Sequence, residues 1–504
     1  DAAAVPELTM WHWLAAAAIA LPLGFAAAAR PALEAARVAP VEAISNSEPL
    51  EKKRSRAPVW RRLSPLAMLG LGFWCALQPP LWDLPLWGYA AALCAILAAA
   101  LAVPGTLLWT EARARSWLSK LGIEGRLAAA QVRASHGRLS ISVAALAVSL
   151  ALTIAIAIMV GSFRQTVIYW VDQTMGADLY IRPAAQANAA APPAFSPATV
   201  DVLRAHPQVL LAEGYRSMEV PFRDRSIRLG VSDYETMVQR GRVALKTAGD
   251  ANAILRAARA AGEVLISESF ALRFKVREGS EIELNTPKGP RKFRIAAVVY
   301  DYTNDRGTLT LDSPVFAEAF GAQPPTHMAL YLKPGADADQ VRDEIQRSLA
   351  GRARLMIFTN AGLRAEVLKI FDSTFAITWA LEIIAVLVAM AGVAATMLTL
   401  VLERQREMRL LRLVGADAAQ VRRTVVIEAG LLGLVSQTLG IVIGMLLSLV
   451  LIHVINPQSF GWSMRLHVPW WFLAGSTALT LAGTMLAGLY PAWRITRQPL
   501  HHQT

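Results

Sequence analysis

The densest group of charged side chains lies in the stretch VLERQREMRLLRLVGADAAQVRRTVVIEAG, residues 401–430. Apolar runs at 376–400 and 427–455 adjoin it, and both are long enough to lie inside a membrane. Its arginines are Arg404, Arg406, Arg409, Arg412, Arg422 and Arg423. A passive connecting loop needs no such group. These residues therefore predict binding chemistry, directed either at anionic lipid headgroups or at a protein partner.

Helix formers occupy the first half of this stretch, and Gly415 then ends the helix as glycine commonly does at a C-terminus. Asp417, followed three residues later by Gln420, resembles a capping box that begins a second helix. A basic amphipathic helix could lie on lipid headgroups, where each Lys or Arg contributes about 1 kcal/mol. Glu403 and Glu407 favour a protein groove instead, because a purely lipid-seeking surface gains nothing from acids.

The same helix carries an apolar strip beside its arginines, formed by Leu410, Leu411, Leu413 and Val414. Charges of both signs next to an apolar strip suit a helix that docks on a protein partner. The residues predicted to form this docking surface are Glu403, Arg404, Arg406, Glu407, Arg409, Leu411, Arg412 and Gly415.

Two acids, Glu382 and Glu428, lie inside apolar runs, where ionisable residues are often functional. Glu428 is close to the end of its run, and we expect an ion pair with Arg422 or Arg423 rather than a functional role. Glu382 lies nearer the other side of the membrane. For it, a proton-relay role in a water-filled cavity is the alternative to a structural one.

Small residues inside the apolar runs predict helix packing. Gly440 and Gly444 form a GxxxG pattern, which permits close approach of a second helix, and the sequence leaves that helix open. Cys75 and Cys94 also lie in apolar runs and are predicted to be packing residues. The segments outside these runs consequently have no disulfide framework.

No arrangement of catalytic or metal-binding residues stands out. The sequence has no G-x-x-x-x-G-K-[ST] and no Gly-Lys dipeptide, and therefore no phosphate-cradling P-loop. Its 8 histidines are scattered without an H-E-x-x-H pattern, and there is no G-x-S-x-G motif. We expect this chain to have no catalytic residues, no metal site and no bound cofactor.

The composition indicates an integral membrane protein. Of the 504 residues, 54% are hydrophobic and 17% are charged, whereas a soluble domain usually carries about 25% charged residues. The net charge of +12 could suggest nucleic acid, but the basic residues gather in connections between apolar runs. We therefore expect the basic residues to lie beside a membrane, and we expect no nucleic-acid partner.

Seven candidate transmembrane helices are predicted, at 10–29, 64–79, 85–109, 138–161, 373–402, 427–455 and 469–493. The connections between them alternate between basic and non-basic once 162–372 is placed outside as a folded domain. This alternation predicts that the N-terminus of the chain lies outside and that its C-terminus is cytoplasmic.

The segment 162–372 has the pattern of a folded extracytoplasmic domain. The runs ADLYIR, GYRSMEVPF, EVLIS, EIELN, RKFRIAAVVY, HMALYL and RLMIF predict strands. Helices are predicted to begin near Ser196 and Asp337. The predicted fold class is an α-helical membrane protein with an α+β extracytoplasmic domain between the fourth and fifth spans. Its stalks would be 162–176 and 361–372.

An internal similarity links RPALEAARVAP (30–40) with YPAWRITRQP (490–499), and each follows a span predicted to run from outside to inside. This similarity suggests two homologous membrane halves. Because the sequence begins at Asp1 with no basic residue before its first apolar run, we expect a late segment of a longer chain.

The stretch 401–447 resembles the FtsX/MacB-type (type VII) permeases of ABC transporters. In that family a span ends in E-R-x-x-E-[IM]-x-x-L-R-x-x-G-A, and a Glu-bearing, glycine-rich span follows. The matching residues here are Glu403, Arg404, Glu407, Met408, Leu411, Arg412, Gly415, Ala416 and Glu428. The segment from Gly262 to Tyr302 resembles the outer domain of the family, and GLYPAWRITRQPL resembles its closing helix.

The resemblance implies the C-terminal part of a ten-span member and the following organisation. Residues 1–45 would end a first FtsX-like half, and 46–124 would hold two connecting spans. Residues 125–161 would form the opening helix and first span of a second half, and 162–372 would form a MacB-like periplasmic domain with stalks. Residues 373–504 would contain three closing spans, with a coupling helix at 403–415.

The resemblance also implies a permease subunit of the bacterial cytoplasmic (inner) membrane that has no ATPase activity of its own. A separate ABC ATPase subunit, which uses ATP and Mg, would dock on the coupling helix and move the outer domain. The implied function is export or extraction of a lipophilic, lipoprotein or peptide substrate, in some members with a periplasmic adaptor or substrate-binding protein. The alternative is mechanotransmission to a periplasmic partner, or sensing of antimicrobial peptides, without transport. A membrane-bound enzyme is a third class, which the lack of a catalytic cluster disfavours.

Overall fold

The computed structural model describes residues 59–496, apart from 83, 185–193, 240–242, 404–409 and 411, together with scattered positions between 10 and 29. The chain divides into two compact units, Asp1–Arg62 and Leu63–Thr504, and the second contains the membrane helices and the outer domain described here. Half of the positions in the predicted span 10–29 lie outside the described residues.

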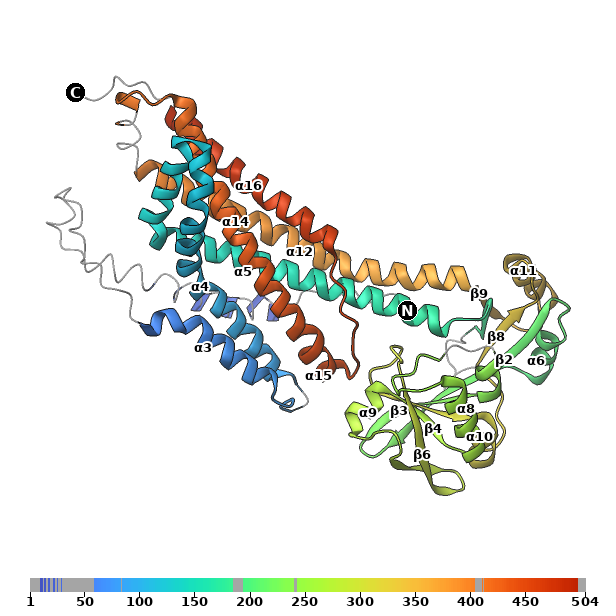
Figure 1. The fold of residues 1–504 in the computed structure, drawn as a ribbon. Helices are drawn as coiled ribbons and strands as arrows, with labels where there is room; N and C mark the ends of the chain where they lie inside the picture. Colours follow the sequence, from blue (N-terminus) through green and yellow to red (C-terminus); the bar gives the residue numbers. More distant parts are fainter. Residues whose placement is uncertain are drawn as a thin grey trace. The chain divides into compact units, whose positions relative to one another are not determined.

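Long helices make up the membrane portion of the second unit (Figure 1). A π-helical turn, Leu451–Ile455, and the short helix α15, Asn456–Phe460, continue α14 without a break. The helices are α3 (Val59–Ala76), α4 (Leu86–Leu118), α5 (Ile123–Thr174), α12 (Asn360–Glu403), α14 (Ala418–Val450) and α16 (Trp470–Thr496).

Among the described residues, four helices are long and apolar enough to cross a membrane. They are Leu86–Ala114, Leu139–Thr174, Ala418–Phe460 and Trp470–Leu489, and they confirm the predicted spans 85–109, 138–161, 427–455 and 469–493. The predicted span 64–79 corresponds to a shorter apolar helix, Leu63–Ala76. The range 373–402 is helical within α12, although many of its side chains are outside the described residues. The predicted total of seven spans is therefore not confirmed.

A close approach within the membrane portion is that of α14 to α5. A Cβ atom added at Gly440 would lie 2.8 Å from the Cβ of Leu150, and one at Gly444 would lie 2.8 Å from the Cβ of Ile154. Leu150 and Ile154 are fully buried. The GxxxG pattern thus packs on α5, where two adjacent turns of one helix meet two adjacent turns of the other.

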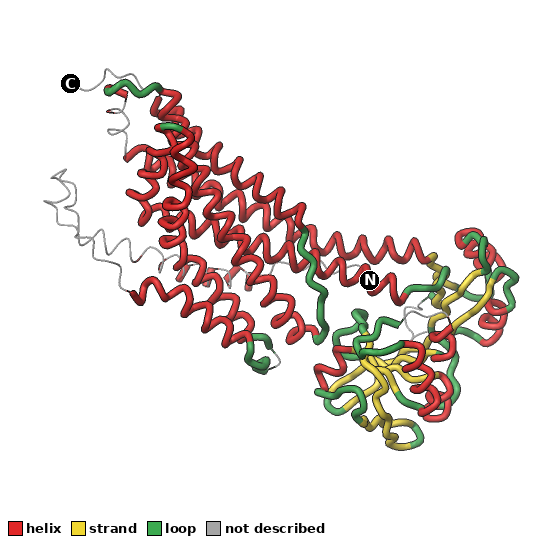
Figure 2. Tube along the Cα trace, in the orientation of Figure 1, coloured by secondary structure: helices red, strands yellow, loops and turns green. Residues whose placement is uncertain are grey.

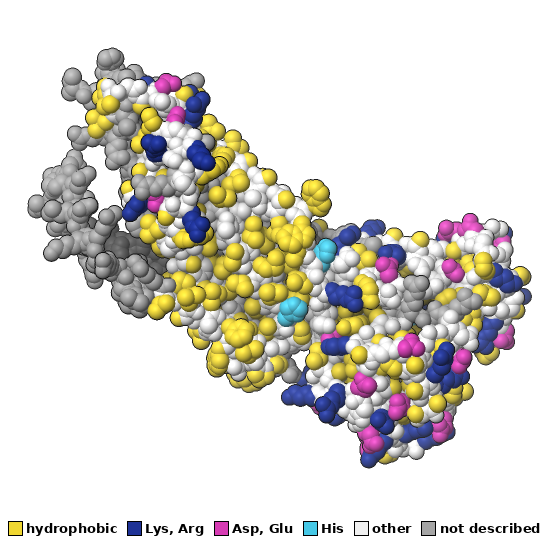
Figure 3. Space-filling view, in the orientation of Figure 1, with side chains coloured by type: hydrophobic (Ala, Val, Ile, Leu, Met, Phe, Trp, Pro, Cys, Tyr) yellow, Lys and Arg dark blue, Asp and Glu magenta, His cyan; other side chains and the backbone are white. Residues whose placement is uncertain are grey.

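Glycines on α14 and α16 create a second close contact. A Cβ atom at Gly433 would overlap Oγ1 of Thr484, and one at Gly488 would lie 2.8 Å from the Cβ of Ala429. Because Gly440 faces α5 and Gly433 faces α16, α14 is held on two sides by small-residue contacts. On the face drawn in Figure 3, hydrophobic side chains cover much of the middle of the helical bundle, and charged side chains lie near its end.

We expect Gly444→Ala to lower the stability of the chain, because the new methyl group would meet both Ile154 and the backbone oxygen of Ala151 at 2.9 Å. Overpacking of this kind costs about 1–3 kcal/mol. The matched control is Gly475→Ala on α16, where an added Cβ meets nothing within 4 Å. Thermal unfolding in detergent should show a lower Tm for the first variant only, and equal Tm values would contradict the proposed packing.

The outer domain is built on a mixed nine-stranded sheet with the order β5-β6-β4-β7-β3-β2-β8-β1-β9. The long strand β2 pairs with β3 over its second half and with β8 over its first half, so one strand joins two hydrophobic cores. The strands are β1 (Leu179–Pro183), β2 (Val209–Phe222), β3 (Arg225–Ser232), β4 (Val264–Ser267), β5 (Glu281–Thr286), β6 (Gly289–Val299), β7 (Thr308–Asp312), β8 (His327–Leu332) and β9 (Leu355–Thr359).

Short helices cover this sheet (Figure 2). Two of them begin where the sequence predicted, because the side chains of Ser196 and Asp337 accept hydrogen bonds from backbone N–H groups of the first turn. The seven predicted strand runs correspond to β1, β2, β4, β5, β6, β8 and β9. The helices are α6 (Pro197–Arg204), α7 (Tyr234–Gln239), α8 (Ala251–Ala261), α9 (Glu268–Phe274), α10 (Ser313–Phe320) and α11 (Ala338–Ser348).

Two continuous helices, α5 and α12, connect the outer domain to the membrane portion. The C-terminal end of α5 and the N-terminal end of α12 are joined by an ion pair between Arg364 and Asp172, with Nη1 and Oδ1 2.7 Å apart. The amide of Asn360 donates to the backbone oxygens of Met175 and Ala177 at 3.0 and 2.7 Å. The two helix ends therefore form one cross-linked unit next to β1.

Candidate functional site

The break between α12 and α14 has the geometry that the sequence predicted. Gly415 has a φ of +108°, a backbone conformation that favours glycine because it has no Cβ. The backbone N–H of Asp417 donates to Oε1 of Gln420 at 2.9 Å, as in a capping box, and α14 begins at Ala418. The position of the break in the chain is therefore defined by local interactions on both of its sides.

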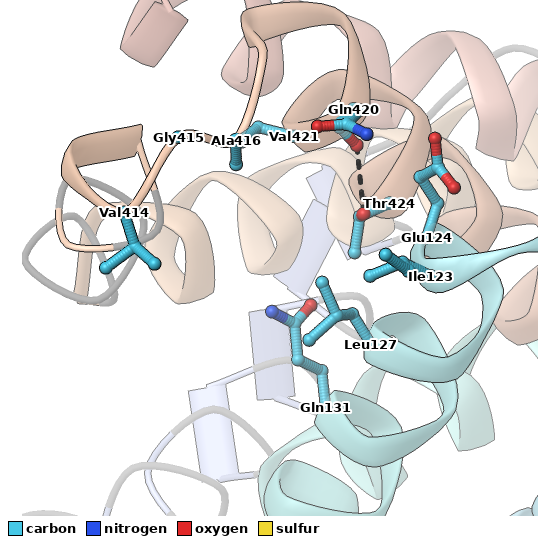
Figure 4. A pocket seen from close by; sticks show the side chains of 10 residues that line it. All are labelled: Ile123, Glu124, Leu127, Gln131, Val414, Gly415, Ala416, Gln420, Val421 and Thr424. Carbon is cyan, nitrogen blue, oxygen red and sulfur yellow. Dashed lines mark hydrogen bonds between the residues drawn. The ribbon is translucent and has the colours of Figure 1, made fainter.

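A cavity of about 320 Å³ lies beside this break (Figure 4). One wall comes from the start of α5, and the other comes from the break and the first turns of α14 (Figure 4). Oγ1 of Thr424 donates to the backbone oxygen of Gln420 at 2.9 Å, which uses the polar atom of Thr424 within its own helix. The lining residues are Ile123, Glu124, Leu127, Gln131, Val414, Gly415, Ala416, Gln420, Val421 and Thr424.

Exposed apolar side chains precede Gly415 in the chain, and one of them, Val414, lines the cavity. Leu410 is 54% exposed, Leu413 is 69% exposed and Val414 is 88% exposed. Arg412 lies among them and is partly buried. An exposed apolar group next to a hollow is typical of a surface that binds another protein.

Glu124 of α5 is a site residue that the sequence analysis did not single out. Its side chain is 15% exposed, and Oε1 lies 4.0 Å from Nη1 of Arg423. Glu124 lines both the cavity beside Gly415 and a neighbouring hollow that Arg422 and Arg423 also line. It lies in the first turn of α5, two residues after Gly122, where an acid stabilises the helix N-terminus. This position next to a helix start is the feature by which the sequence could have pointed to Glu124.

The structure locates only some of the predicted docking residues. Arg412 and Gly415 are described, and Glu403 is the last residue of α12. The residues outside the described part of the chain are Arg404, Arg406, Glu407, Arg409 and Leu411. For all eight residues the docking role stays a prediction.

The two intramembrane acids lie in different helices. Glu428 is 3% exposed within α14, and Glu382 lies in α12 with its side chain outside the described residues. Glu428 is five and six positions from Arg423 and Arg422, and residues at those spacings do not share a helix face. The predicted ion pair of Glu428 therefore stays a prediction, and the described pairing of Arg423 is with Glu124.

Comparison with known proteins identifies the class of this chain. Residues 379–500 match the FtsX-like permease C-terminal domain, and residues 139–348 match the MacB-like periplasmic core domain. An uncharacterized ABC transporter permease of Mycobacterium tuberculosis is 28% identical over 479 residues, which is 93% of this chain and 55% of the relative. These domains define an ABC transporter permease.

More distant similarities extend to an archaeon and to solved outer domains. An uncharacterized ABC transporter permease of Methanocaldococcus jannaschii is 24% identical over 208 residues, 40% of this chain and 52% of the relative. The periplasmic region of MacB from Actinobacillus actinomycetemcomitans gives 11% identity and a TM-score of 0.29, covering 39% of this chain and 95% of that structure. The extracellular domain of the transporter YknZ from Gram-positive bacteria gives 12% identity and a TM-score of 0.25, with coverage of 36% and 99%.

The chain thus contains the two domains of ABC transporter permeases of the FtsX/MacB type. It spans about half the length of the curated relatives that it matches.

We expect Gln420→Ala to loosen the start of α14, because the backbone N–H of Asp417 loses its described acceptor. Loss of a cap costs about 1 kcal/mol, which corresponds to roughly fivefold faster amide exchange. Gln420→Glu is the matched control, since Glu also completes a capping box. Hydrogen–deuterium exchange should show the change in residues 415–424 of the first variant, and identical exchange in both variants would argue against the cap.

Proposed function

We propose that this chain is the membrane subunit through which a separate ABC ATPase moves an extracytoplasmic domain. The main observation behind this proposal is that a single helix, α5, runs from the cavity beside Gly415 to the outer domain. Ile123 and Glu124 at the start of α5 line the cavity beside Gly415, and Thr174 at its end adjoins the outer domain. At 1.5 Å per residue, these 52 residues extend about 78 Å. This length exceeds the hydrocarbon thickness of about 30 Å and supports transmission from one side to the other.

The docking surface for the ATPase would be the break itself. The coupling helix, residues 403–415, carries charges of both signs, and its described end is an exposed apolar group beside a cavity. A groove on the ATPase could take Leu413 and Val414, while the arginines meet acids at its rim. The first turn of α5 would be displaced together with the break, because both line the same cavity.

The substrate class that we propose is lipophilic, lipoprotein or peptide, exported or extracted at the outer side of the inner membrane. The implied orientation has the N-terminus of the chain outside and the C-terminus in the cytoplasm. This orientation follows from the alternation of basic connections. In this proposal Glu382 and Glu428 are acids inside the membrane-spanning helices.

A second candidate function is mechanotransmission without transport. The ion pair between Arg364 and Asp172, with the amide contacts of Asn360, ties the two stalk helices together where they meet the outer domain. A cross-linked pair of helices suits the delivery of movement to a periplasmic partner. Stimulation of ATP hydrolysis by lipid or peptide in the reconstituted complex would favour transport. Stimulation only by a periplasmic protein would favour mechanotransmission.

We expect the triple change Arg406→Glu, Arg409→Glu and Arg412→Glu to abolish co-purification with the ATPase, because it reverses the charge of the coupling helix. Membrane insertion should be unaffected. The matched control makes the same change at three exposed basic residues of the outer domain, Arg256, Lys275 and Arg277. If the ATPase still binds the coupling-helix variant as well as it binds the control, the docking assignment is wrong.

We expect Arg364→Asp to reduce the stimulated ATP hydrolysis of the complex severalfold, because the introduced carboxylate and that of Asp172 would repel each other across the stalks. Asp172→Arg should do the same, since two guanidinium groups would then face each other. Because the native atoms are 2.7 Å apart, the double charge swap should restore most of the activity. Full activity of both single variants would show that the stalks need not be joined.

A further inference from the structure

Besides the stalks, the outer domain makes a third attachment to the membrane portion. It is formed by residues 461–467, which connect α15 to α16, and by α9 and Tyr302 of the outer domain. The central residue is Glu268, which opens α9 and is 1% exposed. We call this group of contacts the latch.

Glu268 joins the two sides of the latch by hydrogen bonds. Its Oε2 accepts from the backbone N–H of Ser463 at 2.9 Å and from Oγ of Ser463 at 3.0 Å. Its Oε1 accepts from Nζ of Lys246 in the outer domain. A buried carboxylate is costly unless such donors surround it. If Ser463 moved away, the carboxylate of Glu268 would therefore lose two of its hydrogen-bond donors and keep only Lys246.

Tyr302 adds a second polar contact at the same residue. Its hydroxyl donates to the backbone oxygen of Ser463 at 3.2 Å. Burial, with the nearby carboxylate of Glu268, raises the pKa of Tyr302, so the phenol stays protonated and remains a donor. Both the N–H and the C=O of Ser463 are thus held by side chains of the outer domain.

Aromatic and small residues close the latch around these polar contacts. The ring of Trp462 packs on Tyr302, with centroids 5.1 Å apart, and on Phe163 of α5 at 5.3 Å. Gly461 has a φ of +75°, and a Cβ added there would lie 3.3 Å from the Cβ of Ser269. The backbone at Gly461 therefore lies directly against the first turn of α9.

The other end of the connection is held by α5. The backbone N–H of Arg465 donates to Oγ1 of Thr166 at 3.0 Å, and that of His467 donates to Oγ of Ser162 at 2.9 Å. The guanidinium of Arg465 lies 3.8 Å from the ring centroid of Tyr169. The connection is consequently bonded on one side to a stalk helix and on the other side to the outer domain.

We propose that Glu268 is the positioning residue of a latch that opens and closes during the movement of the outer domain. This inference rests on the proposed function, in which the stalks move the outer domain. The latch would connect that moving domain to α14 and α16 as well. The reason is geometric. If only α5 and α12 carried the domain, it could turn about them without affecting α14 or α16. With Glu268 bonded to Ser463, a displacement of α14 or α16 relative to α5 must either move the outer domain or break these bonds.

The first test needs no ATPase. In the full chain in lipid nanodiscs, Glu268→Ala should speed hydrogen–deuterium exchange in residues 461–465 at least tenfold, while exchange in β3 and β7 stays unchanged. The matched control is Glu263→Gln, which removes a different acid of the outer domain, one that lies 3.6 Å from Arg294. Unchanged exchange at 461–465 in Glu268→Ala would overturn the latch. Faster exchange throughout β3 and β7 would also overturn it, because Glu268 would then serve only the domain fold.

The second test locks the latch reversibly. The variant Gly461→Cys with Ser269→Cys, made with Cys75→Ala and Cys94→Ala, places two Cβ atoms 3.3 Å apart, so a shift of a few tenths of an ångström brings them to the separation of about 3.8 Å that is typical of a disulfide. We expect oxidation to reduce ATP hydrolysis of the complex with its ATPase at least fivefold, and dithiothreitol to restore it. Each single-cysteine variant is the control for oxidation itself.

The outcomes separate the latch from the proposed function. If the ATPase binds and the oxidised variant keeps its full rate of ATP hydrolysis, the latch is not an opening element and the inference fails alone. If no ATPase binds the unmodified chain, the proposed function fails, and the moving latch fails with it. Disulfide yield should also change severalfold between nucleotide-free complex and complex trapped with ATP and vanadate. Equal yields would overturn the inference.

Discussion

The close contact of α14 with α5 is the interaction on which the other arrangements depend. Gly440 and Gly444 allow the backbone of α14 to approach Leu150 and Ile154 without intervening side chains. Since lipid tails solvate apolar side chains as well as a neighbouring helix does, such packing is the main force available between membrane helices. The two ends of α5 carry the parts to which we assign function: the cavity beside Gly415 lies at its start, and the ion pair of Asp172 with Arg364 lies near its end. Holding α14 against the middle of α5 therefore sets the relation between the two.

Polar contacts are placed where the chain leaves the apolar part of the bundle. At one end Glu124 meets Arg423, and at the other Glu268 meets Ser463 and Arg364 meets Asp172. Of these acids, only Glu268 is almost fully buried, and it has three donors. This difference has a physical consequence. The partly exposed pairs can separate into water at little cost, whereas separation of Glu268 from Ser463 would leave a buried carboxylate with fewer donors and is therefore costly.

The sequence predicts the elements of this protein better than it predicts their contacts. The break at Gly415 and the helix starts at Ser196 and Asp337 are local, because the residues that make them are neighbours in the chain. The strands β3 and β7 were not predicted, although Ile227, Leu229 and Val231 of β3 alternate with polar or small residues as a half-buried strand requires. Glu268 and Ser463 are 195 residues apart, and nothing in the sequence pairs them. The helix that receives Gly440 was likewise left open, since a GxxxG pattern names no partner.

The continuity of α5 constrains how this protein can change. One residue inserted into a helix rotates everything beyond it by about 100° and shifts it by about 1.5 Å. Between Ile123 and Thr174, an insertion would turn the outer domain away from Asn360 and separate Thr166 from the backbone of Arg465. Loops of the outer domain carry no such restriction. Among homologues that keep this architecture, the length of α5 should be invariant to the residue while the loops between strands vary freely.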